Sequence, residues 1–98
     1  MGKIVIPSPV YPDIDSLEFK EELKKYGIKD VQFLLDDGIQ ITYSDNIEPL
    51  DVKPDSVTFY NCKSKIPVIK YVANFDYAEF YLMPDEETPI CKIKTFNI

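Results

Sequence analysis

The side chains that could carry chemistry in this sequence are carboxylates, tyrosines, lysines and two cysteines. The sequence contains no His, and all eleven basic residues are Lys. Without His the chain lacks the side chain most often used as a general acid or base, and without Arg it lacks the planar fork that recognises phosphate and carboxylate groups. We therefore predict that the protein is not an enzyme and has no catalytic residue. A small hydrolase built on two carboxylates is the enzymatic alternative.

The sequence also lacks the usual patterns of metal and cofactor sites. Cys62 and Cys91 lie far apart, and without His they match no common zinc ligand set, so we interpret them as buried strand residues. Asp13 and Asp15 are spaced like the start of a calcium loop, but Leu17 stands at the next ligand position. The three glycines are too scattered for a phosphate-binding loop. We expect no metal and no cofactor.

The acidic residues are concentrated in one part of the chain. The formal net charge is -6, and all of it lies in residues 30–62, since residues 1–29 and 63–98 each balance to zero. The acids of this segment, set against Lys53 alone, are Asp30, Asp36, Asp37, Asp45, Glu48, Asp51 and Asp55. Tyr43 and Tyr60 flank the later acids. Such a segment repels nucleic acid and attracts a basic protein surface.

Tyrosine is the second group of candidate binding residues, with seven in the chain. Tyr77 and Tyr81 alternate with Ala78 and Phe80 in a strand-like run, which puts both tyrosines on an outer face with Glu79. Tyr is enriched at protein interfaces because it joins a large apolar body to a polar tip. The predicted partner-binding residues are Asp36, Asp37, Tyr43, Asp45, Glu48, Asp51, Asp55, Tyr60, Tyr77, Glu79 and Tyr81.

A helix is the clearest local element near the N-terminus. Asp15 as N-cap with Glu18 three residues later forms a capping box, which predicts a helix from about Ser16. Gly27 is the expected stop, giving a helix of three turns. Its predicted apolar stripe consists of Phe19, Leu23 and Tyr26.

Strands are predicted on both sides of a hairpin. Residues 3–6 form a first strand, followed by a proline-stiffened linker. Two alternating apolar runs surround Asp36-Asp37-Gly38, which predicts a three-residue hairpin loop with Gly38 in a left-handed conformation. We expect this loop to pair residue 35 with 39, 33 with 41 and 31 with 43. Residues 44–55, polar and interrupted by Pro49 and Pro54, are interpreted as a long surface connection.

Four further strands are predicted in the second half of the sequence, at residues 57–62, 66–75, 77–83 and 90–96. Pro67 must then stand at the very beginning of a central strand. The expected fold is α+β, a single domain over residues 1–98, in which a β-α-β-β unit precedes a four-stranded meander and one helix packs on an antiparallel sheet.

These features favour protein binding as the function. The sequence has no apolar run long enough for a membrane span and no signal-peptide pattern, so we expect a cytoplasmic protein, in the host cytoplasm if it is viral. The leading hypothesis is an acidic inhibitor, or an immunity or anti-defence factor of viral or mobile-element origin. As a nucleic-acid mimic it would occupy a basic surface of a nucleic-acid-processing enzyme or toxin, without binding nucleic acid or membrane itself. The alternative is a homo-oligomeric virion or scaffold subunit that associates through a tyrosine-bearing sheet edge.

Overall fold

The computed structural model describes residues 2–6, 10–12, 19–34, 38–73, 77–85 and 87–97 of the chain. Strands account for 69% of the structure and helix for 6%. The elements in chain order are β1 (Gly2–Ile6), β2 (Val10–Pro12), α1 (Phe19–Lys24), β3 (Ile28–Leu34), β4 (Gly38–Tyr43), β5 (Ile47–Lys53), β6 (Ser56–Asn61), β7 (Pro67–Ala73), β8 (Tyr77–Leu82) and β9 (Pro89–Asn97). Within the described ranges, no helix is long and apolar enough to cross a membrane.

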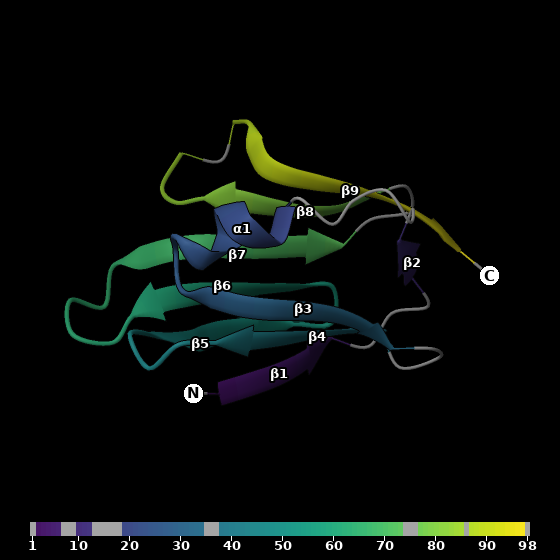
Figure 1. The fold of residues 1–98 in the computed structure, drawn as a ribbon. Helices are drawn as coiled ribbons and strands as arrows, with labels where there is room; N and C mark the ends of the chain where they lie inside the picture. Colours follow the sequence, from purple (N-terminus) through teal and green to yellow (C-terminus); the bar gives the residue numbers. More distant parts are fainter. Residues whose placement is uncertain are drawn as a thin grey trace.

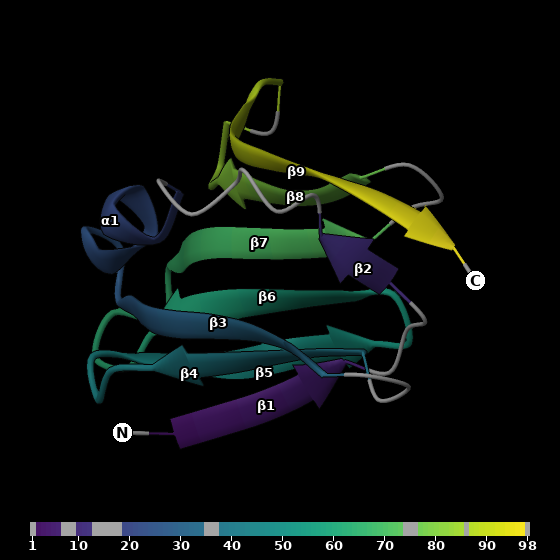
Figure 2. The same cartoon turned by 45° about the vertical axis from the view of Figure 1, so that its right-hand side comes forward.

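The strands form two antiparallel sheets that face each other. A three-stranded sheet has the order β1-β4-β3, and a six-stranded sheet has the order β2-β9-β8-β7-β6-β5. Figure 1 shows the small sheet in front of the lower half of the large sheet, and the turned view of Figure 2 shows the two layers again. The rings of Tyr43 and Phe59, one from each sheet, lie 5.3 Å apart between centroids. The fold is therefore a two-layer β structure with its core between the sheets.

Alternation along the strands explains how the core fills. In the small sheet, Ile4 and Ile6 lie opposite Ile41 and Ile39, and these side chains turn to the same inner face. In the large sheet, the register sets one inner row across β6, β7 and β8, made of Val57, Tyr71 and Phe80. All three residues of that row are fully buried.

The predicted α+β class is wrong, because the helix is too short to form a layer. α1 has six residues and contacts β3 and β9 rather than covering a sheet. Its last turn tightens, since the Tyr26 and Gly27 amides donate to the carbonyls of Leu23 and Lys24, which are i→i−3 bonds that end an α-helix. Gly27 ends it as predicted, with φ at 99°. The predicted capping box of Asp15 and Glu18 lies outside the described residues.

The predicted long connection at residues 44–55 is also wrong, because most of it is strand β5. Lys53 pairs with Ser56, so Pro54 and Asp55 form a two-residue hairpin turn. Pro49, which suggested a loop, is tolerated because β5 has a neighbour on one side only in the described structure, β6. The polar and acidic composition of this segment belongs to an exposed edge strand.

The predicted hairpin exists with a different register. Leu34 pairs with Gly38, Phe33 with Ile39 and Val31 with Ile41, a shift of two residues from the predicted pairs. Because side chains repeat every two residues, the shift keeps both apolar runs on one face. Gly38 has the predicted positive φ, 98°, but it is the first residue of β4. Residues 35–37 lie outside the described part of the chain.

The predicted four-stranded meander is longer than expected. β5 to β9 pair in sequence order, so five strands take part, and β2 adds to β9 through Tyr11 opposite Phe96. The segment interpreted as a linker after β1 therefore contains a strand. Pro67 is the first residue of β7, and β7 lies between β6 and β8, both as predicted.

Candidate functional site

The open edge of β5 is the most distinctive surface in the described structure. β5 hydrogen-bonds to β6 on one side and to no described strand on the other. Leu50 and Val52 on this strand are each 54% exposed, and a β-bulge lies between Pro49 and Asp51. An edge strand with unpaired backbone groups and exposed apolar side chains is a template for another chain.

Four of the predicted binding residues lie on β5 or on the turns that flank it. Asp45 is in the turn before the strand, Glu48 and Asp51 are within it, and Asp55 is in the turn after it. All except Glu48 are exposed. The structure therefore arranges these acids along one sheet edge. Of the earlier acids, Asp30 lies on β3, whereas Asp36 and Asp37 fall outside the described residues.

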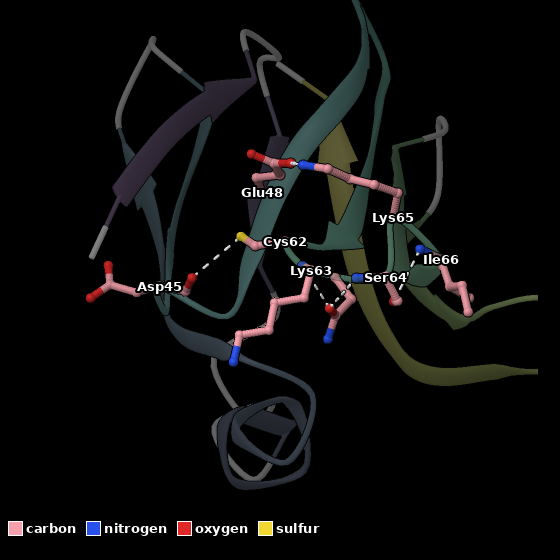
Figure 3. A network of polar contacts seen from close by, with 8 residues as sticks. Asp45, Glu48, Cys62, Lys63, Ser64, Lys65 and Ile66 are labelled. Carbon is pink, nitrogen blue, oxygen red and sulfur yellow. Dashed lines mark hydrogen bonds and ion pairs between the residues drawn. The ribbon is translucent and has the colours of Figure 1, made fainter.

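The acidic character of this edge is partly balanced by Lys65, which the charge count of residues 30–62 did not include, as well as by Lys53. Figure 3 shows Lys65, in the loop between β6 and β7, reaching across to the Glu48 carboxylate. The hydrogen bond with Glu48 raises the pKa of Lys65. Lys53 adds a further exposed cation on β5 itself. Counted with Lys65, the edge has a smaller net negative charge than the charge count of residues 30–62 indicates.

The loop that presents Lys65 is held by its own hydrogen bonds. The side-chain oxygen of Asn61 accepts from the backbone N–H groups of Lys63 (2.9 Å) and Ser64 (3.0 Å), and Figure 3 draws the bonds from Lys63 and Ser64 as dashed lines. Lys65 takes a left-handed conformation with φ at 59°. The Asn61 amide and this left-handed residue fix where the Lys65 side chain starts. The predicted strands at residues 57–62 and 66–75 left residues 63–65 as a connection, and the structure has a loop there.

The turn before β5 is tied to the same loop. The Cys62 backbone N–H donates to the Asn46 carbonyl at 2.9 Å, and the Cys62 thiol donates to the Asp45 carbonyl at 3.3 Å. Figure 3 shows the thiol contact beside the Lys65–Glu48 pair. The two contacts position Asp45 at the start of the β5 edge.

The two tyrosines predicted to flank the acids differ in position. Tyr43 lies at the inner face of the small sheet, with its ring against Phe59. It also covers Gly2, where an added Cβ would lie 2.4 Å from the ring. Tyr60 is opposite Glu48 in the register and half-buried. Tyr60 therefore lies beside the acids of β5, whereas Tyr43 packs against the core.

Tyr77, Glu79 and Tyr81 share the outer face of β8, since the intervening Ala78 and Phe80 are fully buried. Glu79 is only 8% exposed and accepts a 2.8 Å hydrogen bond from the Tyr81 hydroxyl. The Lys92 ammonium lies 4.0 Å from the centroid of the Tyr77 ring. β8 runs between β7 and β9, so the strand that bears these tyrosines is not a sheet edge.

The register joins the two predicted groups across the outer face of the large sheet. Asp51 lies opposite Thr58, Thr58 opposite Lys70, and Lys70 opposite Tyr81. The acids of β5 and the tyrosines of β8 are therefore on one face, separated by β6 and β7. Lys70 stands between them.

A pocket of about 280 Å³ lies where the end of α1 meets the turn before β5 and the β6–β7 loop. Its polar lining includes Lys24, Lys25 and Lys29 with the amides of Asn46 and Asn61. Lys24 and Lys25 are already paired with Glu21 and Glu22, at 3.2 and 3.0 Å. The sequence patterns did not point to this pocket, because its residues come from four separated segments.

The arrangement offers binding chemistry. Cys91 is buried, and burial raises the pKa of its thiol to about 12, which keeps it in the unreactive protonated form at neutral pH. Among the described residues no three His, Cys, Asp or Glu side chains cluster in a way that could hold a metal ion.

Compared with known protein families, with curated proteins and with solved structures, the chain shows no match.

Proposed function

We propose that this chain is a small protein-binding module, and that it acts as an inhibitor or as an immunity or anti-defence factor. The observation that carries the proposal is the open edge of β5, where exposed acids, exposed apolar residues and unpaired backbone groups occur together. The partner is a protein with a basic surface, and a nuclease, another nucleic-acid-processing enzyme or a toxin has the kind of cleft that acids can occupy.

Three properties of β5 support binding, and each acts on a different part of a partner. Asp51 and Asp55 are exposed carboxylates that speed the encounter with positive charge. Leu50 and Val52 supply apolar surface to be buried. The unpaired backbone can add an extended segment as a further strand, which gives main-chain hydrogen bonds. The edge therefore combines steering, burial and orientation.

Self-association as an assembly or scaffold subunit is the second candidate function. The observation in its favour is that Leu50 and Val52 are each 54% exposed on an edge strand, since apolar edges pair with other edges. The outer tyrosines of β8 do not support the predicted association through a tyrosine-bearing sheet edge, because β8 is an interior strand.

The binding proposal is tested with a charge-neutral variant of the β5 edge. The variant combines Asp45→Asn, Glu48→Gln, Asp51→Asn and Asp55→Asn. A matched control neutralises four acids elsewhere, Glu21→Gln, Glu22→Gln, Asp85→Asn and Glu87→Gln, and so has the same net charge. Each protein is immobilised, exposed to cell lysate at low and at high salt, and the captured proteins are then purified and their affinities measured.

We expect a partner that binds the unchanged protein and the control. Its affinity should fall as the salt concentration rises. It should bind the β5 variant at least tenfold more weakly. The substitutions are at the surface, where a change typically alters the free energy of unfolding by less than about 0.5 kcal/mol. Both variants also lose polar contacts, those of Asp45 and Glu48 in one and those of Glu21 and Glu22 in the other, so the control is matched in this respect too. Equal loss of binding in both variants would show that net charge acts without a site on β5. Unchanged binding in both would move the interface to the outer face of β8.

A further inference from the structure

We propose that two copies of this chain associate by pairing their β5 strands in antiparallel orientation about a twofold axis, with Glu48 of each copy facing Lys53 of the other. The proposal goes beyond the inhibitor function, because it requires no other partner, and it rests on the second candidate above, self-association, to which it gives a specific register. It starts from the same open edge, where nothing in the described structure covers Leu50 and Val52.

The bulge in β5 determines which antiparallel register of two β5 strands places side chains of the same sheet face opposite each other. Pro49 is opposite the buried Phe59, and Val52 is opposite the buried Val57, so both residues are on the inner side of the strand. In a regular strand, residues three positions apart lie on opposite faces. The extra residue between Pro49 and Asp51 removes this difference. An antiparallel pairing can therefore place Pro49 against Val52 of the second copy with both side chains on one face.

The same register places opposite charges against each other at both ends of the strand, where Glu48 also contacts Lys65 of its own copy. Glu48 and Lys53 lie at the two ends of β5 and both turn to the outer face, opposite Tyr60 and Ser56. When Pro49 faces Val52 of the second copy, the next residues outward in each strand are Glu48 and Lys53. The twofold axis repeats this pair, so opposite charges meet at both ends. Opposite charges directly across antiparallel strands stabilise the pair, whereas like charges destabilise it.

The backbone of β5 is compatible with this pairing. Residues along an antiparallel pair alternate between those bonded to the neighbour and those directed away from it. Lys53 and Ser56 close the two-residue turn, so the next residue, Val52, directs its N–H and C=O to the open edge. Pro49 has no N–H, but its carbonyl can accept from Val52 of the second copy. Each copy then donates one such bond and accepts one.

This pairing would also control access to the edge. A copy seated on β5 covers the strand that a basic partner would use, so self-association and capture of a partner there would compete. The oligomeric state is measured on the purified chain alone, whereas the function proposed above is measured with a partner. Failure of one test therefore leaves the other interpretable.

The test is the mass of the purified protein in solution, measured by light scattering after size exclusion, over a range of concentrations. The unchanged chain is expected at twice 11.3 kDa and Lys53→Glu at 11.3 kDa, because Glu would then face Glu48. Glu48→Lys should likewise be monomeric. The double variant Glu48→Lys/Lys53→Glu restores opposite charges and is expected to recover the dimer. Lys24→Glu, on α1, makes the same charge change away from β5 and should remain dimeric.

Hydrogen exchange of the Val52 amide provides a second measurement that needs no variant. Its exchange should slow by tenfold or more as protein concentration rises through the dimerisation range, while the Ser64 amide, which is bonded within its own loop, should not respond. A monomer at every concentration overturns the proposal. So does a dimer in which both single reversals are tolerated, or a concentration-independent Val52 amide. A folded double variant that stays monomeric overturns the register in which Glu48 faces Lys53.

Discussion

Val52 and Val57 lie opposite each other in the register of β5 and β6, yet Val57 is fully buried and Val52 is 54% exposed. The two side chains belong to the same face of one sheet. Ile47, at the other end of β5, is only 4% exposed and belongs to the core. The rim of the core therefore crosses β5 along its length, and the later residues of β5 are held mainly by their pairing with β6.

Tyr71→Phe should stabilise the protein. Tyr71 is fully buried, its ring packs against Phe80 at 5.1 Å between centroids, and its hydroxyl has no hydrogen-bond partner in the part of the chain that the structure describes. Removing a buried unpaired hydroxyl is expected to raise the free energy of unfolding by about 1–3 kcal/mol in urea titrations. Tyr60→Phe, at a half-exposed site, is the control and should change it by less than about 0.5 kcal/mol. A lower stability of Tyr71→Phe would contradict this assignment.

The free energy of unfolding should fall in alkaline solution. Burial raises the pKa of Cys91 from 9.0 to about 12 and raises the pKa of Tyr71 above its ordinary value of 10.0. Both groups ionise more easily when the chain unfolds, so their contribution to stability is constant below about pH 9 and is lost above it. The expected slope is about 1.4 kcal/mol per pH unit for each group once its unfolded form ionises. Urea titrations from pH 7 to 11 measure it, and Cys91→Ala should remove the part that begins near pH 9.

The two cysteines should differ in reactivity toward a thiol reagent. Cys91 is 6% exposed and protonated at neutral pH, whereas Cys62 lies half-buried at the surface loop of β6 and β7. One thiol per chain is expected to react in the native protein and two in urea. Cys62→Ser should abolish the native reaction, and Cys91→Ala should leave it intact. Rapid labelling of Cys62→Ser would mean that β9 opens readily from β8.

Gly27→Ala should destabilise the chain. Gly27 has φ at 99°, and a Cβ there would lie 3.0 Å from the Ile47 side chain and 3.1 Å from the Ser44 hydroxyl oxygen. Backbone strain of this kind costs about 1–3 kcal/mol, and thermal unfolding should show the loss. Lys25→Ala in the same turn is exposed and is the control. Equal stability of Gly27→Ala and the control would show that this turn can relax.

Local patterns predicted those parts of the fold that depend on neighbouring residues. The inner and outer faces of the hairpin and of β8 follow from alternation, and Pro67 marks the start of β7 because proline fits poorly inside a sheet. β5 was missed because an edge strand in water carries the acids and prolines that also characterise loops. β2 was missed because three residues around Pro12 give no periodic signal, and its pairing with β9 joins distant parts of the chain.

The candidate site was predicted only in outline, because contacts between distant parts of the chain leave no local pattern in the sequence. The acids of residues 45–55 do lie along one edge, but the contact of Lys65 with Glu48 depends on how two separate loops meet. Charge counted along the sequence assigned Lys65 to a neutral segment, although in space it lies beside β5. The outer position of Tyr77 and Tyr81 was predictable from alternation, whereas the burial of Glu79 between its neighbours was not.

The pairing order of the strands has a consequence for how the chain is made. Each strand from β5 to β9 pairs with the strand next to it in the sequence, and β9 also pairs with β2, so the β5–β9 half can fold through short loops as each hairpin is completed. β1 and β2 are made before their partners, since Ile4 pairs with Ile41 and Tyr11 with Phe96. β1 must therefore wait for β4, and β2 must wait until β9 has been made.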